Sequence, residues 1–139
     1  MPITNIDLRS LLTHSRTIAV VGHSDKSYRE SYRIGMYLRE AGYRVYPVNP
    51  TITTIEGEMC YPTLAAVPEP IDIVDVFRRP VFLPEIVEDA ITVKAKALWT
   101  QLGVVHIEAL TRAREAGLVV VSNRCILVEH QRLGIPFHV

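Results

Sequence analysis

Residues 17–31 read TIAVVGHSDKSYRES, and this stretch decides the fold that we expect. Its first five residues are apolar or β-branched, the composition of a strand that helices cover on both faces. Gly22 follows immediately, and the polar loop after it leads to Ser31, which favours the start of a helix. The order of strand, glycine-containing loop and helix predicts the beginning of a parallel βαβ unit.

Four further β-rich runs follow along the chain, separated by segments with helical spacing. The five runs are 17–21, 43–48, 71–77, 97–102 and 118–121. This alternation predicts an α/β protein with one Rossmann-like domain over residues 1–139. The domain is expected to hold an open, five-stranded, mainly parallel sheet with helices on both faces.

Helices are expected before and between the strands, each marked by a residue that suits a helix start or a buried helix face. These residues are Thr4 for a short first helix over about 4–13, Ser31, Pro84 and Ile107. The connection 49–70 is rich in Pro and Thr. We expect it to be mostly loop, with a short helical piece after Thr63.

Composition excludes several classes of protein. Fifteen basic and fifteen acidic side chains give a formal net charge of +0, so no overall field attracts nucleic acid or an anionic membrane. The apolar runs are far shorter than the ~20 residues that cross a bilayer. Residues 1–12 lack the apolar core of a signal peptide. We therefore expect a cytoplasmic protein whose partner is a small molecule, with no nucleic-acid or membrane partner.

The carboxyl ends of the predicted strands are the expected binding site, because ligands of open parallel sheets lie where the connections diverge. Gly22 lets a phosphate approach the backbone, and the following helix offers free N–H groups. Donors and cations also follow the next two strands, at Asn49 and at the pair Arg78 and Arg79. A locally basic edge on a neutral protein suits a phosphorylated ligand such as coenzyme A (CoA). The alternative is an ordinary polar loop with a capping serine.

Two other nucleotide sites are not indicated. The loop after the first strand lacks the second and third glycines of G-x-G-x-x-G, and Asn49 stands where an acidic residue would hold a ribose. No strand is followed by G-K-[ST], the end of a P-loop. The sequence therefore argues against a nicotinamide cofactor and against P-loop chemistry.

The chain resembles the standalone CoA-binding protein family, whose domain is similar to the amino-terminal CoA-binding domain of succinyl-CoA synthetase alpha subunits. The matching blocks run from residue 17 to about 133 and include TIAVVG (17–22), SDK (24–26), PVNP (47–50), VDVFRR (74–79), LWTQLGV (98–104) and RC (124–125). His23 departs from the family, which usually carries a small or apolar residue there. Ser122 and Asn123 stand in place of an acidic residue that is common before the Arg-Cys pair.

The resemblance implies binding of CoA or an acyl-CoA through its nucleotide and phosphates at the carboxyl ends of the strands. The binding residues that it implies are Gly22, Ser24, Asp25, Lys26, Ser31, Val48, Asn49, Pro50, Phe77, Arg78 and Arg79. The phosphorylated histidine of the synthetases belongs to a second domain, for which we expect no counterpart here. No residue of this chain corresponds to it, so the resemblance implies no catalytic residue.

Two alternatives stay open. A nucleotide-dependent enzyme or redox protein would use Cys125, because Glu129 and His130 follow at helical distance and a His-paired thiolate is a good nucleophile. The i+4 spacing favours Glu129 as the neighbour of the thiol. An interaction subunit of an acyl-CoA ligase-type assembly would need a protein partner. The five histidines show no metal-ligand spacing, so we expect no metal site.

Overall fold

Five parallel strands form the central sheet of the computed structural model, which describes residues 3–138. The strand order is β2-β1-β5-β6-β7, and every pairing in this sheet is parallel. The strands are β1 (Thr17–Val21), β2 (Arg44–Val48), β5 (Ile73–Val76), β6 (Ala97–Thr100) and β7 (Val119–Val121). The predicted α/β class and the five-stranded sheet are therefore confirmed, with strands one to three residues shorter than most of the predicted runs.

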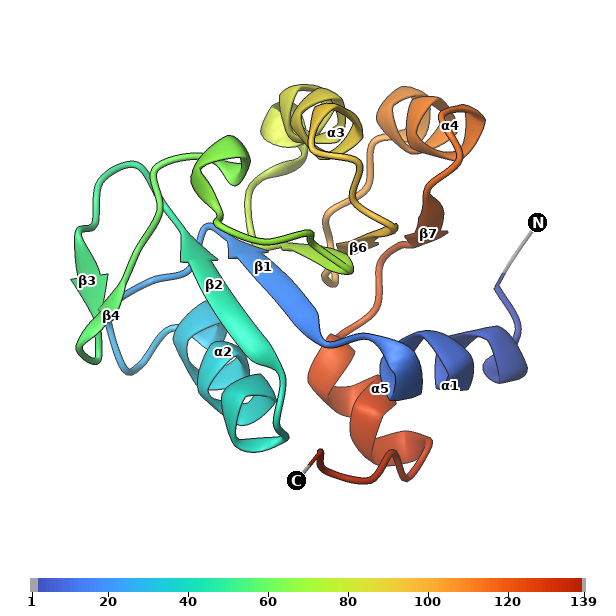
Figure 1. The fold of residues 1–139 in the computed structure, drawn as a ribbon. Coiled ribbons are helices and arrows are strands. Elements are labelled where there is room, and N and C mark those ends of the chain that lie inside the picture. Colours follow the sequence, from blue (N-terminus) through green and yellow to red (C-terminus); the bar gives the residue numbers. More distant parts are fainter. Residues whose placement is uncertain (1–2, 139) are drawn as a thin grey trace.

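Five α-helices cover the sheet on its two faces (Figure 1). They are α1 (Asn5–His14), α2 (Glu30–Glu40), α3 (Leu83–Thr92), α4 (Ile107–Glu115) and α5 (Ile126–Arg132). Helices α3 and α4 lie over one face, and α1, α2 and α5 lie over the other. Alternate residues of each strand enter the two cores: Val74 packs with the α3 and α4 side chains, and Ile73 packs with those of α1, α2 and α5. Burial on both faces explains why the strands are almost continuously apolar.

The strand order creates a switch point between β1 and β5. The chain leaves β1 through α2 toward β2 at one edge of the sheet, whereas it leaves β5 through α3 toward β6 on the other side. The two connections therefore part at the carboxyl ends of β1 and β5, on opposite faces (Figure 1). A crevice at such a point is the usual ligand site of an open parallel sheet.

Two local predictions about the helices need correction, and a third is confirmed. Ser31 is not the cap of α2, because Arg29 occupies that position without a side-chain cap and Ser31 lies inside the first turn. Ile107 is 71% exposed rather than turned to the sheet, since Leu110 and its neighbours fill the α4 face. The predicted start of the third helix near Pro84 is confirmed, because α3 begins at Leu83 with Pro84 in its first turn, directly after a 3₁₀ turn over Pro80–Phe82.

The long connection between β2 and β5 holds more structure than a loop. The short helical piece is confirmed as a 3₁₀ turn over Leu64–Ala66. The connection also contains a two-stranded hairpin that was not predicted, formed by β3 (Thr54–Ile55) and β4 (Glu58–Met59). Its strands are too short to show alternation, but its tip carries Gly57 with φ +78°, the backbone that a tight hairpin turn needs.

None of the helices within residues 3–138 combines the length and the apolar character needed to cross a membrane.

Candidate functional site

Two hollows open beyond the carboxyl ends of β1, β2 and β5. The first, which we name the apolar hollow, has a volume of about 310 Å³. It is lined by Val21, Val48, Pro50, Pro62, Thr63, Leu64, Arg78, Phe82, Glu85, Ile86 and Asp89. The second, the loop hollow, has a volume of about 370 Å³. It is lined by Gly22, Ser24, Arg29, Glu30, Ser31, Asn49, Ile52 and Phe77.

The sheet edge separates the two hollows. At the end of β1, Val21 lines the apolar hollow and Gly22 lines the loop hollow; Val48 and Asn49 divide in the same way after β2. Successive residues of a strand point to opposite faces, which explains the division. One ligand that crosses this edge can therefore contact both hollows.

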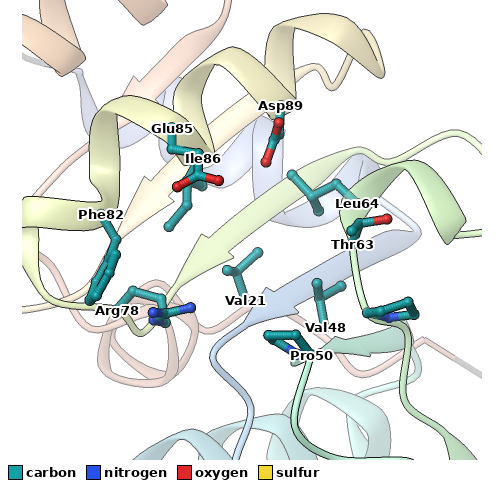
Figure 2. A pocket seen from close by; sticks show the side chains of 11 residues that line it. Val21, Val48, Pro50, Thr63, Leu64, Arg78, Phe82, Glu85, Ile86 and Asp89 are labelled. Carbon is teal, nitrogen blue, oxygen red and sulfur yellow. The ribbon is translucent and has the colours of Figure 1, made fainter.

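The apolar hollow combines hydrophobic walls with charges at its borders (Figure 2). Figure 2 shows Val21 and Val48 on the strands and Ile86 on α3 facing the same space. The Arg78 guanidinium lies over the Phe82 ring, 4.0 Å from its centroid. Such a stacked pair leaves a flat, cationic surface that suits an aromatic base or a phosphate. The hollow is thus able to hold a heterocyclic ring, with a cation at its border.

Two carboxylates of α3, Glu85 and Asp89, border the apolar hollow on the helix side (Figure 2). Burial, and secondarily the nearby charge of Glu85, raises the pKa of Asp89 above its ordinary value. Carboxylates accept hydrogen bonds from amino groups, so this border suits a ligand that carries an exocyclic amine.

Gly22 brings the loop after β1 against the end of β5. Its φ of +87° is left-handed, and a Cβ atom there would lie 2.8 Å from the carbonyl oxygen of Phe77. The Gly22 N–H donates to the Val48 carbonyl at 2.8 Å, which ties the loop to β2 as well. Only glycine fits this backbone and this approach. The three strand ends are therefore held together at one residue.

The amino-terminal turn of α2 borders the loop hollow, whose lining includes Glu30 and Ser31. The N–H groups of residues 30–32 begin α2, and none of them has an acceptor within the described residues. The N–H of Ser24 donates to the Ser31 hydroxyl at 2.9 Å, and the N–H of Lys26 donates to the Ser24 hydroxyl at 3.0 Å. Free N–H groups and the positive end of the helix dipole make this helix start suitable for an anion.

The structure brings eight of the eleven predicted binding residues to the two hollows. Gly22, Ser24, Ser31, Asn49 and Phe77 line the loop hollow, and Val48, Pro50 and Arg78 line the apolar hollow. Three predicted residues line neither: Asp25, Lys26 and Arg79. The Lys26 ammonium lies 3.9 Å from the Asp25 carboxylate, and the two side chains are 61% and 43% exposed.

Several residues that close the hollows were not predicted from the sequence. Phe82 and Ile86 come from the segment after β5, and Thr63 and Leu64 come from the connection after β2. The same topological rule that selected Arg78 could have extended to Phe82 and Ile86, because they follow the same strand end. Nothing in the sequence marks Thr63 or Leu64, since only the folded path of the connection brings them there.

Within the described residues, no hydrogen bond joins the Cys125 thiol to a base. The Glu129 carboxylate, predicted to face the thiol, instead pairs with Arg124 at 2.9 Å and with Arg132 at 2.6 Å. The His130 ring is hydrogen-bonded to the Tyr37 hydroxyl, with 2.7 Å between Nδ1 and the oxygen. Both groups that a nucleophilic thiol would need are thus engaged elsewhere. Within residues 3–138, no cluster of His, Cys, Asp or Glu is arranged to hold a metal ion.

Comparison with known proteins gives matches over most of the chain. A family model described as a CoA binding domain matches residues 16–131. The uncharacterised protein YneT of Bacillus subtilis is 39% identical over 124 residues, which are 89% of this chain and 92% of that protein. The solved structure of a hypothetical protein from Pyrococcus horikoshii OT3 superimposes with a TM-score of 0.92 at 43% identity and covers 96% of each chain.

A further relative is a much larger protein. The ADP-forming acetate–CoA ligase II of Archaeoglobus fulgidus is 28% identical over 85 residues, which are 60% of this chain but 12% of the ligase. The similarity thus concerns a small part of that enzyme.

Proposed function

This chain belongs to the CoA-binding domain family, and from that premise we propose that it binds CoA or an acyl-CoA at the carboxyl edge of its sheet. The observation that carries the proposal is that Val21 and Gly22, at the end of β1, line two adjoining hollows of different character. One hollow offers backbone donors for phosphates, and the other offers apolar walls and a stacked arginine for a base. CoA carries both kinds of group.

The pyrophosphate is expected at the loop hollow. The unpaired N–H groups of residues 30–32 and the close approach that Gly22 allows support this assignment. The adenine ring is expected in the apolar hollow, against Val48 and beside the stacked pair of Arg78 and Phe82. Arg78 then lies within reach of the ribose phosphate, for which a guanidinium is well suited.

We expect no catalysis by the chain itself. The strongest candidate nucleophile, Cys125, has no hydrogen bond to Glu129 or His130 within the described residues, because Glu129 pairs with two arginines and His130 bonds to the Tyr37 hydroxyl. The chain would then hold CoA, while any chemistry on the acyl group would need another protein. Turnover of acetyl-CoA that disappears in a Cys125→Ala variant would contradict this part of the proposal.

Calorimetric titration of the full chain with CoA and with NAD tests the proposal. CoA should bind more tightly than NAD, because the loop lacks the glycine pattern of dinucleotide sites and Asn49 replaces the ribose-binding acid. NAD binding that equals or exceeds CoA binding would refute the assignment.

A glycine variant tests the site. Gly22→Ala should weaken CoA at least about tenfold, because its Cβ would displace the loop from the Phe77 carbonyl. Gly117→Ala is the matched control, because its φ of +95° brings a similar backbone strain. Nothing lies within 4 Å of a Cβ at this position. Gly117 lies between α4 and the amino end of β7, away from the proposed site. Equal CoA affinity of the two variants would place the ligand elsewhere.

A further inference from the structure

One side chain of the loop after β1 is buried while its neighbours are in solvent. His23 is 0% exposed, whereas residues 25–30 are all exposed. A histidine stands here, in the loop that the proposed function assigns to the phosphates, and the inference below rests on that function. A fully buried polar ring in an otherwise exposed loop needs a specific set of contacts.

Hydrogen bonds hold His23 at its ring and at its backbone. Nδ1 lies 2.8 Å from the carbonyl oxygen of Ser24 and must carry the proton, because a carbonyl only accepts. The His23 carbonyl in turn accepts from the Asn49 amide at 3.1 Å. The Ser24 N–H is bound by the Ser31 hydroxyl. Both backbone groups of Ser24 are therefore engaged, and His23 fixes one of them.

The ring fits against α2 because Gly35 has no side chain. A Cβ atom at Gly35 would overlap with Nε2 of His23 and lie 2.8 Å from its Cδ2. Nε2 is buried and has no hydrogen-bond partner within the described residues. Glycine inside a helix costs roughly 0.5–1 kcal/mol relative to alanine, so its presence at this contact requires a compensating fit. Ring and helix thus form a matched contact.

The surroundings of the ring disfavour a charge. Arg39 of α2 is the nearby cation, and the Tyr32 ring of α2 lies edge-on with 6.3 Å between the centroids. The Tyr32 hydroxyl donates to Glu56 at the hairpin tip, so that carboxylate is already engaged. Burial, opposed in part by the bond to Ser24 and reinforced by Arg39, lowers the pKa of His23.

We propose that His23 is a positioning residue: its neutral ring, seated against Gly35, holds the Ser24 peptide and so sets the geometry of the phosphate-binding loop. A proton on Nε2 would face Gly35 without an acceptor. The charged ring must therefore leave its seat and release Ser24, which makes CoA affinity fall as the pH falls. The ring contacts no ligand in this role.

Two variants separate the hydrogen bond from the packing. His23→Leu fills similar space and removes the donor to Ser24, whereas the side-chain amide of His23→Asn can donate from the position of Nδ1 and does not titrate. At pH 7.5, His23→Leu should bind CoA about 3- to 10-fold more weakly than the native chain. His23→Asn should restore most of that affinity.

The pH profile distinguishes positioning from a merely structural role. Between pH 7.5 and 5.5 the native chain should lose several-fold more CoA affinity than His23→Asn, while the ionisation of CoA itself is common to both. His14→Asn, an exposed residue at the end of α1, is the control and should follow the native profile. Thermal melts establish that each variant is folded.

The outcomes are separable from those of the proposed function. A native chain that does not bind CoA refutes the proposed function. A native chain that binds CoA, together with a His23→Leu variant of equal affinity, refutes the positioning role alone. A His23→Asn profile that parallels the native one refutes the pH dependence. Nitrogen-detected NMR should show the Nδ1–H tautomer of His23, and an Nε2–H tautomer would contradict the contact with Ser24.

Discussion

Charged side chains at the amino ends of the strands are paired, whereas, within the described residues, three arginines beyond the carboxyl ends are not. At the amino edge, Asp72 accepts from the N–H groups of Arg16 and Thr17, at 2.7 and 3.1 Å, and pairs with Lys96 at 3.3 Å. Glu69 holds Arg44 at the same edge through both carboxylate oxygens. At the carboxyl edge, the cations Arg29, Arg78 and Arg79 form no ion pair within residues 3–138. The paired charges at the amino ends therefore contribute to the fold, whereas the three unpaired arginines are available to bind a ligand.

The same contrast is seen at β5, between Asp72 at its amino end and Asp75 near its carboxyl end. Burial would raise the pKa of Asp72, but the two N–H donors and Lys96 outweigh it and keep the pKa below its ordinary value. Asp75 is completely buried between Val20 and Trp99, and Gln101 is its one hydrogen-bond donor among the described residues. Burial, only partly offset by Gln101, raises the pKa of Asp75 to about 8. The carboxylate of Asp72 is fully bonded, whereas the Oδ2 atom of Asp75 has no hydrogen-bond partner within the described residues.

The largest expected effect is the pH dependence of the Asp75→Asn variant. Because the pKa of Asp75 is raised in the folded state, the native chain loses stability as the pH rises from about 4 to about 8. Asparagine does not titrate, so the variant should gain on the order of 4 kcal/mol relative to the native chain across this range. Urea unfolding at pH 4, 6 and 8 measures it.

Asp72→Asn is the matched control, with the opposite sign. Its lowered pKa stabilises the fold above pH ~4, and this contribution is lost as the pH falls below that value. The variant should therefore be less stable than the native chain at pH 7 and approach it in acid. Parallel pH profiles for the two variants would remove the contrast between the ends of β5.

Arginine variants at the two edges should show the next largest effect. Arg78→Ala should weaken CoA roughly tenfold or more, since a charge-assisted bond to phosphate is worth about 1.5–3 kcal/mol, and should leave the melting temperature almost unchanged. Arg44→Ala, which breaks the pair with Glu69, should leave CoA affinity unchanged. Titration and melting of both variants check this. A loss of affinity at Arg44 would mean that the edges do not differ as proposed.

A double-mutant cycle at the carboxyl edge should give about 1–2 kcal/mol of coupling between His23 and Gly35. In the native chain, Gly35→Ala should destabilise, because the new Cβ overlaps with the imidazole. In a His23→Ala background, the same change should stabilise, as alanine normally does in a helix. Chemical denaturation of the four proteins measures the cycle. The same sign in both backgrounds would contradict the fit.

The smallest effect is expected at Lys26. Its ammonium lies in solvent beside Asp25 and lines neither hollow, so Lys26→Ala should change CoA affinity about twofold or less at physiological salt. Titrations at low and high salt check this. A loss as large as that of Arg78→Ala would show that the loop closes over the ligand and brings Lys26 to it.

Sequence patterns predicted the alternating strands and helices, but they did not predict contacts between residues that are distant in the sequence. Apolar runs predicted β1 and its partners because a strand buried on both faces leaves no polar position. The prediction that Ser31 caps α2 was wrong. A serine near a helix start either caps the helix or accepts a hydrogen bond from the preceding loop, as Ser31 does from Ser24, and the backbone conformation decides between the two. Asp75 gave no signal, since burial of one carboxylate between neighbours from other strands has no periodicity.

The binding residues divide in the same way. Gly22, Asn49 and Arg78 were predicted because each directly follows a strand, and their positions need only the topology. Thr63 and Asp89 needed the course of a long connection and the rotation of α3, which the sequence does not specify. Lining residues that come from a long connection or from a helix are therefore harder to predict than those that directly follow a strand.

The seat of His23 against Gly35 also restricts how this protein can diverge or be redesigned. Position 35 tolerates a side chain only if position 23 gives up its ring, so substitutions at the two sites are expected to arise in a fixed order: the residue at 23 shrinks first, and the helix then gains its methyl group. The reverse order passes through a variant in which the new Cβ at position 35 overlaps with the His23 ring. Although positions 23 and 35 lie twelve residues apart in the chain, we expect their substitutions to depend on each other.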